Sequence, residues 1–194
     1  MKKLLITGFE PFGGEKINPS WEAVLRLPNE INGFEITKLL IPVVFELAAK
    51  KVIDVAEDKY DAVICVGQAG GRSAITPELV GINLRHAGIP DNEGNEPHDE
   101  PILPNGENAL FSTLPVRKMA EYINKAGVPS QVSYSAGAYV CNDVLYSLLS
   151  HYNGTKTKVC FIHIPYCKEQ GKDPSMELDD IINGLVAAIE SIAV

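Results

Sequence analysis

The stretch Ala62-Val-Ile-Cys-Val-Gly67 contains no charged or amide side chain, and it constrains the fold more than any other feature of the chain. A strand with one face in water alternates apolar and polar residues. A short apolar run without that alternation is typical of a strand covered by helices on both faces. Sheets of this kind are largely parallel, because crossover helices lie above and below them. We therefore expect a central strand of an α/β protein here.

Strand-like and helix-like segments alternate along the rest of the chain. Further strands are predicted at residues 3–7, 34–42, 79–84, 131–135 and 158–164. Helices are predicted to begin near Asn18 and to cover residues 45–58, 115–126, 142–152 and 176–193. Residues 88–108 are rich in Pro, Asn, Gly and acidic side chains, which indicates a long irregular surface segment. The alternation predicts a single domain over residues 1–194, a three-layer α/β/α sandwich with a mostly parallel, twisted mixed sheet of the phosphorylase/hydrolase-like kind.

Charge and cysteine content exclude several classes of function. The formal net charge of −8 argues against nucleic acid or an anionic membrane as the main partner. No apolar run approaches the roughly 20 residues that span a bilayer, and the first one ends at Gly8, so it predicts a buried strand rather than a signal peptide. The four cysteines lack zinc-ligand spacing, so we expect no metal site and a reducing, cytoplasmic location.

Cys141 is the candidate nucleophile. It follows small residues and precedes the helical pattern of Val144 and Leu148, which places it near a helix N-terminus. The positive end of the helix dipole lowers a thiol pKa and favours the reactive thiolate. His163, in the last predicted strand, is the candidate base. The alternative for both residues is structural, since a free cysteine is often buried and a strand histidine can be a hydrogen-bonded core residue.

The predicted topology brings these residues to one rim of the sheet. Ligands of such folds bind beyond the carboxyl ends of the strands. The segments that leave strands there are residues 8–14, 68–78, 136–142 and those after position 163. Glu78 lies in one of them, and it is either the carboxylate that orients His163 in a triad or an ordinary first-turn or loop carboxylate.

Two other functions remain open from the residues alone. Gly67-Gln-Ala-Gly-Gly-Arg72 lacks the spacing of a dinucleotide or P-loop motif, but Arg72 beside two glycines could bind an anion. A non-catalytic nucleotide- or anion-binding protein is therefore one alternative. A nucleoside phosphorylase-like enzyme is another, although it has no use for a nucleophilic cysteine. Phe9 and Phe12 lie in a loop that should face solvent, as a lid over the core or as the wall of an apolar pocket.

Many segments together resemble pyroglutamyl peptidase I, a family of cysteine exopeptidases. The matching segments are Thr7-Gly-Phe-Glu-Pro-Phe-Gly-Gly14, Asn18-Pro-Ser-Trp21, Gly67-Gln-Ala-Gly-Gly-Arg72, Ile75-Thr-Pro-Glu78, Ile89-Pro-Asp-Asn-Glu-Gly94, Ser112-Thr-Leu-Pro115, Ser135-Ala-Gly137, Val140-Cys-Asn142 and Phe161-Ile-His-Ile-Pro-Tyr166. They cover nearly the whole chain in order. The resemblance implies hydrolysis of N-terminal pyroglutamate from peptides through a thioester, without a cofactor or metal, by a homo-oligomer, either a dimer or a tetramer.

The resemblance also implies the site residues. The family's triad falls on Glu78, Cys141 and His163. A pocket for the pyroglutamyl ring is expected to be lined by Phe9, Phe12, Gln68, Ile89, Tyr139 and Val140. Position 139 is often phenylalanine in the family, so the extra hydroxyl of the tyrosine needs a hydrogen-bond partner.

Two positions depart from the family pattern. Gly88 stands where the family usually has an arginine, and Arg72 or Arg85 could supply a charge in its place. Cys167 stands where an apolar residue is expected.

Overall fold

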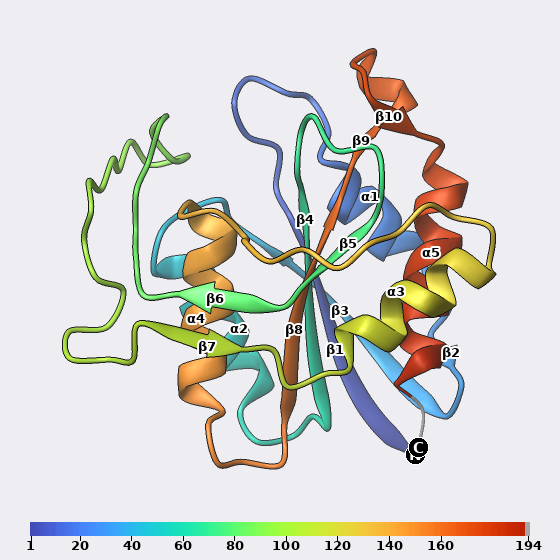
Figure 1. Ribbon diagram of the computed structural model, residues 1–194, viewed down its shortest axis with the longest axis horizontal. Coiled ribbons are helices and arrows are strands. Elements are labelled where there is room, and N and C mark those ends of the chain that lie inside the picture. Colours follow the sequence, from blue (N-terminus) through green and yellow to red (C-terminus); the bar gives the residue numbers. More distant parts are fainter. Residues whose placement is uncertain (193–194) are drawn as a thin grey trace.

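The computed structural model describes residues 1–192, and its centre is a six-stranded sheet in the order β2-β3-β1-β4-β8-β5 (Figure 1). The inner strands are β3 (Phe34–Ile41), β1 (Lys2–Phe9), β4 (Ala62–Gln68) and β8 (Lys158–Ile164). These four run parallel to one another. The edge strands β2 (Glu30–Ile31) and β5 (Thr76–Glu78) are antiparallel, which confirms a mixed, mostly parallel sheet.

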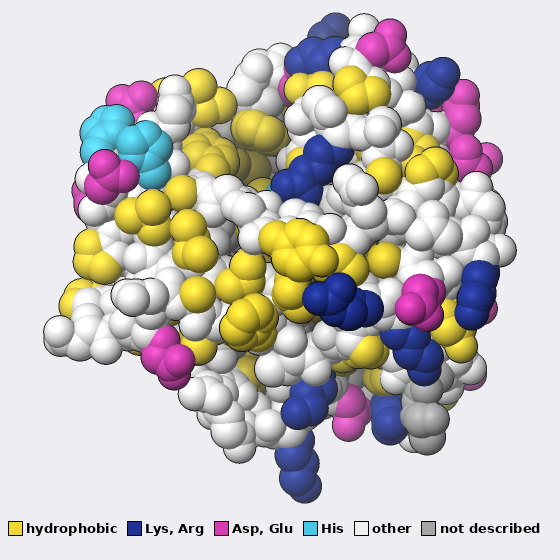
Figure 2. Space-filling model, in the orientation of Figure 1, with side chains coloured by type: hydrophobic (Ala, Val, Ile, Leu, Met, Phe, Trp, Pro, Cys, Tyr) yellow, Lys and Arg dark blue, Asp and Glu magenta, His cyan; other side chains and the backbone are white. Residues whose placement is uncertain are grey.

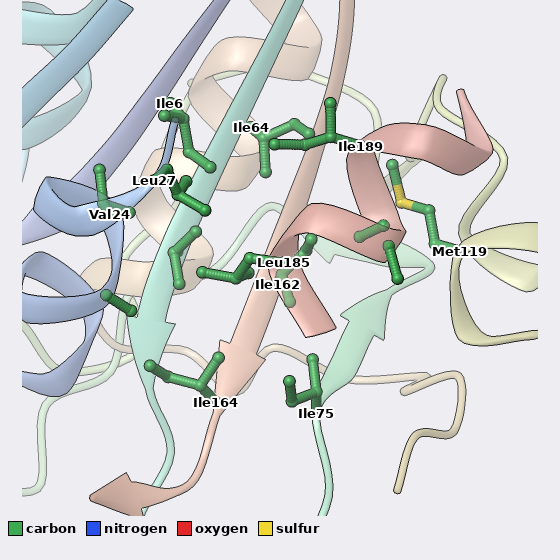
Figure 3. Packing of buried hydrophobic residues seen from close by; sticks show 14 of the residues in the cluster. Ile6, Val24, Leu27, Ile64, Ile75, Met119, Ile162, Ile164, Leu185 and Ile189 are labelled. Atoms are coloured by element: carbon green, nitrogen blue, oxygen red, sulfur yellow. The ribbon is translucent and has the colours of Figure 1, made fainter. Parts of the chain in front are cut away.

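Helices cover both faces of the sheet (Figure 1). One side carries α1 (Pro19–Arg26), α3 (Val116–Lys125) and α5 (Leu178–Ser191), and the other carries α2 (Leu47–Ala56) and α4 (Val140–His151). Strand β4 explains the layering, because Ile64 packs toward α5 while Cys65 packs toward α4. Figure 3 shows Ile64 and Ile162 of the sheet against Leu185 and Ile189 of α5. The predicted three-layer sandwich is confirmed.

Two predicted strands differ from the structure. Residues 79–84 contribute only β6 (Val80–Ile82), which forms a separate two-stranded ribbon with β7 (Ala109–Phe111). Residues 131–135 are not a strand, because the segment makes a single isolated bridge to β5, between Ser133 and Glu78. The edge position at β8 is occupied by β5 instead, a segment expected to be a loop or a helix start.

The helix boundaries differ by a few residues from those expected. Helix α4 begins at Val140, two residues earlier than predicted, so Cys141 lies inside its first turn. The last predicted helix begins at Leu178, because Met176 belongs to β10 (Ser175–Met176), which pairs with β9 (Tyr166–Cys167). Position 193 of that prediction lies outside the described residues. Within residues 1–192, no helix is both long enough and apolar enough to span a membrane.

The long segment 88–108 contains no helix or β-strand, as expected, but it is held by hydrogen bonds. Its buried Asp91 accepts backbone N–H bonds from Phe45, Glu93 and Asn95, at distances of 2.9 to 3.0 Å. Burial favours the neutral acid, but the side-chain amide of Asn95 and then these backbone bonds hold the pKa of Asp91 below its usual value. The start of the segment is thereby fixed beside the chain that enters α2.

Candidate active site

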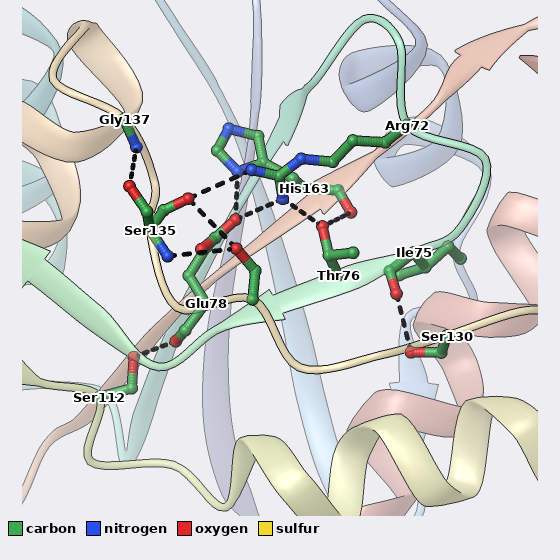
Figure 4. Close-up of polar contacts among 10 residues, drawn as sticks. Arg72, Ile75, Thr76, Glu78, Ser112, Ser130, Ser135, Gly137 and His163 are labelled. Carbon is green, nitrogen blue, oxygen red and sulfur yellow. Dashed lines mark hydrogen bonds and ion pairs between the residues drawn. The ribbon is translucent and has the colours of Figure 1, made fainter. Parts of the chain in front are cut away.

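A buried carboxylate–imidazole pair lies at the end of β8. Antiparallel pairing of β5 with β8 places Glu78 and His163 on adjacent strands, and Glu78 Oε1 lies 2.7 Å from His163 Nδ1 (Figure 4). Their side chains are 0% and 5% exposed. Glu78 is therefore neither a first-turn helix charge nor a solvated carboxylate, because the edge strand carries it into the protein interior.

The pair is arranged as a carboxylate beside a neutral imidazole. Burial lowers the pKa of His163 and outweighs the opposing hydrogen bond and charge of Glu78. Burial of Glu78 favours the neutral acid, but the hydrogen bond and charge of His163, together with the bond from Arg72, outweigh this and hold its pKa below the usual value. Because Nδ1–H then donates to Glu78, the lone pair of Nε2 is left to accept a proton.

Cys141 reaches the same place from the helix layer. It is the second residue of α4, and a Cβ added to Gly67 would lie 3.0 Å from its Sγ atom. Gly67 pairs directly with His163 across β4 and β8. His163 shares its strand face with Phe161, which packs in the cluster of α4, so thiol and imidazole lie on one side of the sheet.

The expected lowering of the thiol pKa is wrong for this structure. Burial, with the charge of Glu78 as a second cause, raises the pKa of Cys141 to about 12. The dipole of a helix is equivalent to about half a charge at its N-terminus, and here it does not offset removal of the thiol from water. Burial thus favours the protonated thiol, and transfer of its proton to a base would generate the nucleophile.

A small cavity opens beside Cys141. It is lined by Phe9, Phe12, Asn18, Val43, Gln68, Tyr139, Val140 and Cys141. Figure 2 shows hydrophobic atoms within a hollow of the face above the N-terminal end of α4.

The lining contains five of the six residues expected to form the pocket. Ile89, the sixth, is half exposed and is not among the described residues that line the cavity. Asn18 and Val43 were missed. Asn18 was identified only as a helix cap, which it also is, since its Oδ1 accepts the N–H of Ser20.

The hydroxyl of Tyr139 has the partner that its substitution for phenylalanine requires. It donates to the backbone carbonyl of Pro90 at 3.1 Å. The ring packs edge-on against Phe45, with 5.2 Å between centroids, and lies 6.5 Å from Phe12. Because Tyr139 lines the cavity and binds Pro90, it holds the start of segment 88–108 against the cavity wall.

Neither arginine near the site is free to replace the charge expected at Gly88. Arg72 lies 2.7 Å from Glu78 Oε1 and donates to the carbonyl of Ser135 at 3.2 Å (Figure 4). Arg85 pairs with Asp143 at 2.6 Å and with an exposed glutamate of the loop before α2. The role of Arg72 in holding Glu78 was missed, because position 72 was considered only as an anion binder or as a substitute for the charge expected at Gly88.

The fold is a three-layer sandwich in which a thiol, an imidazole and a buried carboxylate converge at the rim of the sheet. This arrangement defines a protein of the cysteine hydrolase class. The chain belongs to the pyroglutamyl peptidase family, whose model matches residues 2–194.

Individual relatives agree over the full length. The chain is 49% identical over 197 aligned residues to a protein of Lactobacillus helveticus named pyrrolidone-carboxylate peptidase, covering 98% of both chains. It is 50% identical over 196 residues to a protein of that name from Brachyspira hyodysenteriae, covering 97% of this chain and 98% of the relative. The crystal structure of Bacillus amyloliquefaciens pyroglutamyl peptidase I superimposes with a TM-score of 0.94 at 44% identity, over 99% of this chain and 97% of that one.

Proposed function

We propose that this protein is a cysteine exopeptidase that hydrolyses N-terminal pyroglutamate from peptides. The observation that carries the proposal is the position of Cys141 in the lining of an apolar cavity, on the same side of the sheet as the Glu78–His163 pair. Family membership and the names of the relatives support the same reaction.

The cavity suits a neutral lactam ring. Pyroglutamate has no ammonium group, so its site needs apolar walls and a few polar partners rather than an anchoring carboxylate. Phe9, Phe12 and Val140 supply apolar walls, and Gln68 supplies an amide. Uncyclised glutamine would bury an unpaired ammonium among these walls, which disfavours its binding.

The chemical steps follow from the protonation states. His163 Nε2 takes the thiol proton as Cys141 Sγ attacks the pyroglutamyl carbonyl, and Glu78 stabilises the imidazolium that forms. Free backbone N–H groups in the first turn of α4 stabilise the oxyanion. His163 then returns the proton to the leaving amine, which releases the shortened peptide and leaves a thioester on Cys141. Water, deprotonated by His163, hydrolyses the thioester and frees pyroglutamate.

The test is release of a chromophore from a pyroglutamyl amide by wild type, Cys141→Ala and Cys141→Ser. Turnover is expected for wild type alone, with thermal unfolding showing that both variants fold. Prolyl and glutaminyl amides of the same chromophore are the specificity controls. Retained turnover in Cys141→Ala, or equal rates on the three amides, would contradict the proposal.

We further propose that the enzyme works in the cytoplasm as a homo-oligomer. Its four cysteines, all within the described residues, are free thiols, which suits a reducing compartment. Phe111 and Tyr134 are 66% and 64% exposed, and Figure 2 shows hydrophobic side chains gathered on the face that carries β6 and β7. Light scattering during size-exclusion chromatography is expected to give a multiple of 21.1 kDa, and a monomer would contradict this assembly.

A further inference from the structure

The amide of Gln68 is held by a second glutamine from a distant part of the chain. Gln68 ends β4 and lines the cavity. Gln170 lies in a 3₁₀ turn, Lys168–Gln170, that follows β9, and its Nε2 donates to Gln68 Oε1 at 2.8 Å. The contact joins residues 102 positions apart, so only the fold brings them together.

We propose that Gln170 is a positioning residue that turns the NH₂ group of Gln68 toward the cavity. An isolated glutamine amide can present either its oxygen or its nitrogen, because the two ends have the same shape. Here the orientation is set by a group that cannot reverse, the backbone N–H of Cys167, which donates to Gln170 Oε1 at 3.1 Å. A backbone N–H only donates, so Gln170 must direct its oxygen to it and its NH₂ to Gln68.

The direction of each further bond follows from the first. Since Gln170 Nε2 donates, the end of Gln68 that faces it must be the acceptor oxygen. The NH₂ group of Gln68 is then left for the cavity that the side chain lines. Two further contacts agree with this polarity. Glu15 Oε2, an acceptor, lies 3.4 Å from Gln170 Nε2, and the thiol of Cys167 lies 3.7 Å from Gln170 Oε1 as a weak second donor.

The contact between the Cys167 thiol and Gln170 also explains why position 167, where an apolar residue was expected, holds a cysteine. Cys167 is fully buried in the cluster between the sheet and α5, and burial raises the pKa of its thiol to about 11. It therefore packs as a small uncharged side chain while directing its S–H group to Gln170.

The consequence is a cavity whose glutamine amide donates rather than accepts. A donor at this wall selects a ring that carries a carbonyl oxygen, as the lactam of pyroglutamate does. This assignment of the ligand rests on the proposed function. A ring with a donor in that place would face the NH₂ group and leave two donors unpaired, which costs binding free energy.

The hydrogen bonds that run from Cys167 through Gln170 to Gln68 form a relay that sets the direction of the Gln68 amide. Gln170→Glu reverses this relay with little change in side-chain shape. A carboxylate at 170 can only accept, so Gln68 must turn its NH₂ group toward it and present its oxygen to the cavity. We expect KM for a pyroglutamyl amide to rise about 10- to 100-fold, the range for an unpaired buried polar group, while kcat changes less than about threefold. Gln170→Leu frees the Gln68 amide without reversing it, so a smaller rise in KM is expected. Gln131→Glu, the same change at an exposed glutamine, is the matched control and should leave both constants unchanged.

A double variant separates positioning from general loosening of the site. If Gln170 acts through Gln68, adding Gln170→Glu to Gln68→Ala should produce no further rise in KM. A further tenfold rise, or a fall in kcat with unchanged KM in the single variant, would overturn the relay. Thermal unfolding of each variant shows whether it is folded.

Binding of 2-pyrrolidone keeps this inference distinct from the proposed hydrolysis. Calorimetry in a Cys141→Ala background measures lactam binding without turnover, and Gln170→Glu is expected to weaken it by the same 10- to 100-fold. If wild type fails to cleave pyroglutamyl amides but this weakening is seen, the proposed function fails and the relay stands. If wild type cleaves them and Gln170→Glu leaves both KM and pyrrolidone binding unchanged, the relay alone is wrong.

Discussion

A side chain at position 67 would crowd Cys141 as well as Phe161, since a Cβ on Gly67 would lie 3.0 Å from Cys141 Sγ and 2.7 Å from the ring of Phe161. Gly67 sits directly opposite His163 in the sheet. The bare backbone of β4 therefore lets a thiol from the helix layer approach the strand that carries the imidazole.

Gly67→Ala should consequently displace the thiol. We expect kcat/KM for a pyroglutamyl amide to fall by at least about 100-fold, as for small misplacements of reacting groups, and the free energy of unfolding to fall by about 1–3 kcal/mol from overpacking. Steady-state kinetics and urea unfolding check the two effects. Gly88→Ala, at an exposed glycine with open space around its Cβ position, is the matched control and should be near neutral. Wild-type kinetics in Gly67→Ala would show that the thiol does not need this space.

Glu78→Gln tests the carboxylate of the pair. An amide cannot hold the imidazole in the same way, because it carries no charge to balance the imidazolium and can direct an N–H toward Nδ1. By analogy with other triads we expect kcat to fall about 10³- to 10⁴-fold. Glu121→Gln, at an exposed residue of α3, is the matched control. A loss below about tenfold would mean that Glu78 does not serve as the orienting carboxylate.

Arg72→Gln should change the pH dependence of activity. The charge of Arg72 contributes to lowering the pKa of His163, behind burial as the main cause, so its removal raises that pKa. The base then stays protonated up to a higher pH, and the acid limb of kcat/KM moves upward. Arg72→Lys keeps the charge and should move the limb less. A pH–rate profile of the three proteins measures this, and an unmoved limb in Arg72→Gln would contradict the role assigned to Arg72.

The raised pKa of Cys141 predicts how the free enzyme reacts with iodoacetamide. Only the thiolate is alkylated, and its fraction rises about tenfold per pH unit below the pKa. Because that pKa is about 12, the rate should keep rising between about pH 6 and 9 without a plateau. Mass spectrometry of the peptide carrying Cys141 measures the rate, with Cys141→Ala as the blank. A plateau near neutral pH would instead indicate a preformed thiolate–imidazolium pair.

The sequence pattern was sufficient to predict the layers of the fold and part of the rim that carries the site. The apolar run of β4 predicted a doubly covered strand, and both of its faces are buried in separate clusters. His163 was expected at this rim because parallel strands end at a common edge, and the structure places it at the end of β8. Cys141 was expected there because it follows a predicted strand at 131–135, which is absent, so its position beside β4 comes from the packing of α4 instead. Local periodicity carries this information because it records which face of each element is buried.

Contacts between distant segments decided the rest. Which of β5 and residues 131–135 forms the sheet edge depends on which backbone pairs with β8 in the folded protein, and neither segment has a strong pattern of its own. The pKa of Cys141 depends on burial and on the carboxylate of Glu78, which lies 63 positions earlier in the chain (141 − 78 = 63). The pairing of Gln68 with Gln170 likewise has no local signature. Desolvation and hydrogen-bond direction depend on all the groups that surround a side chain. Those groups come together only when the chain has folded.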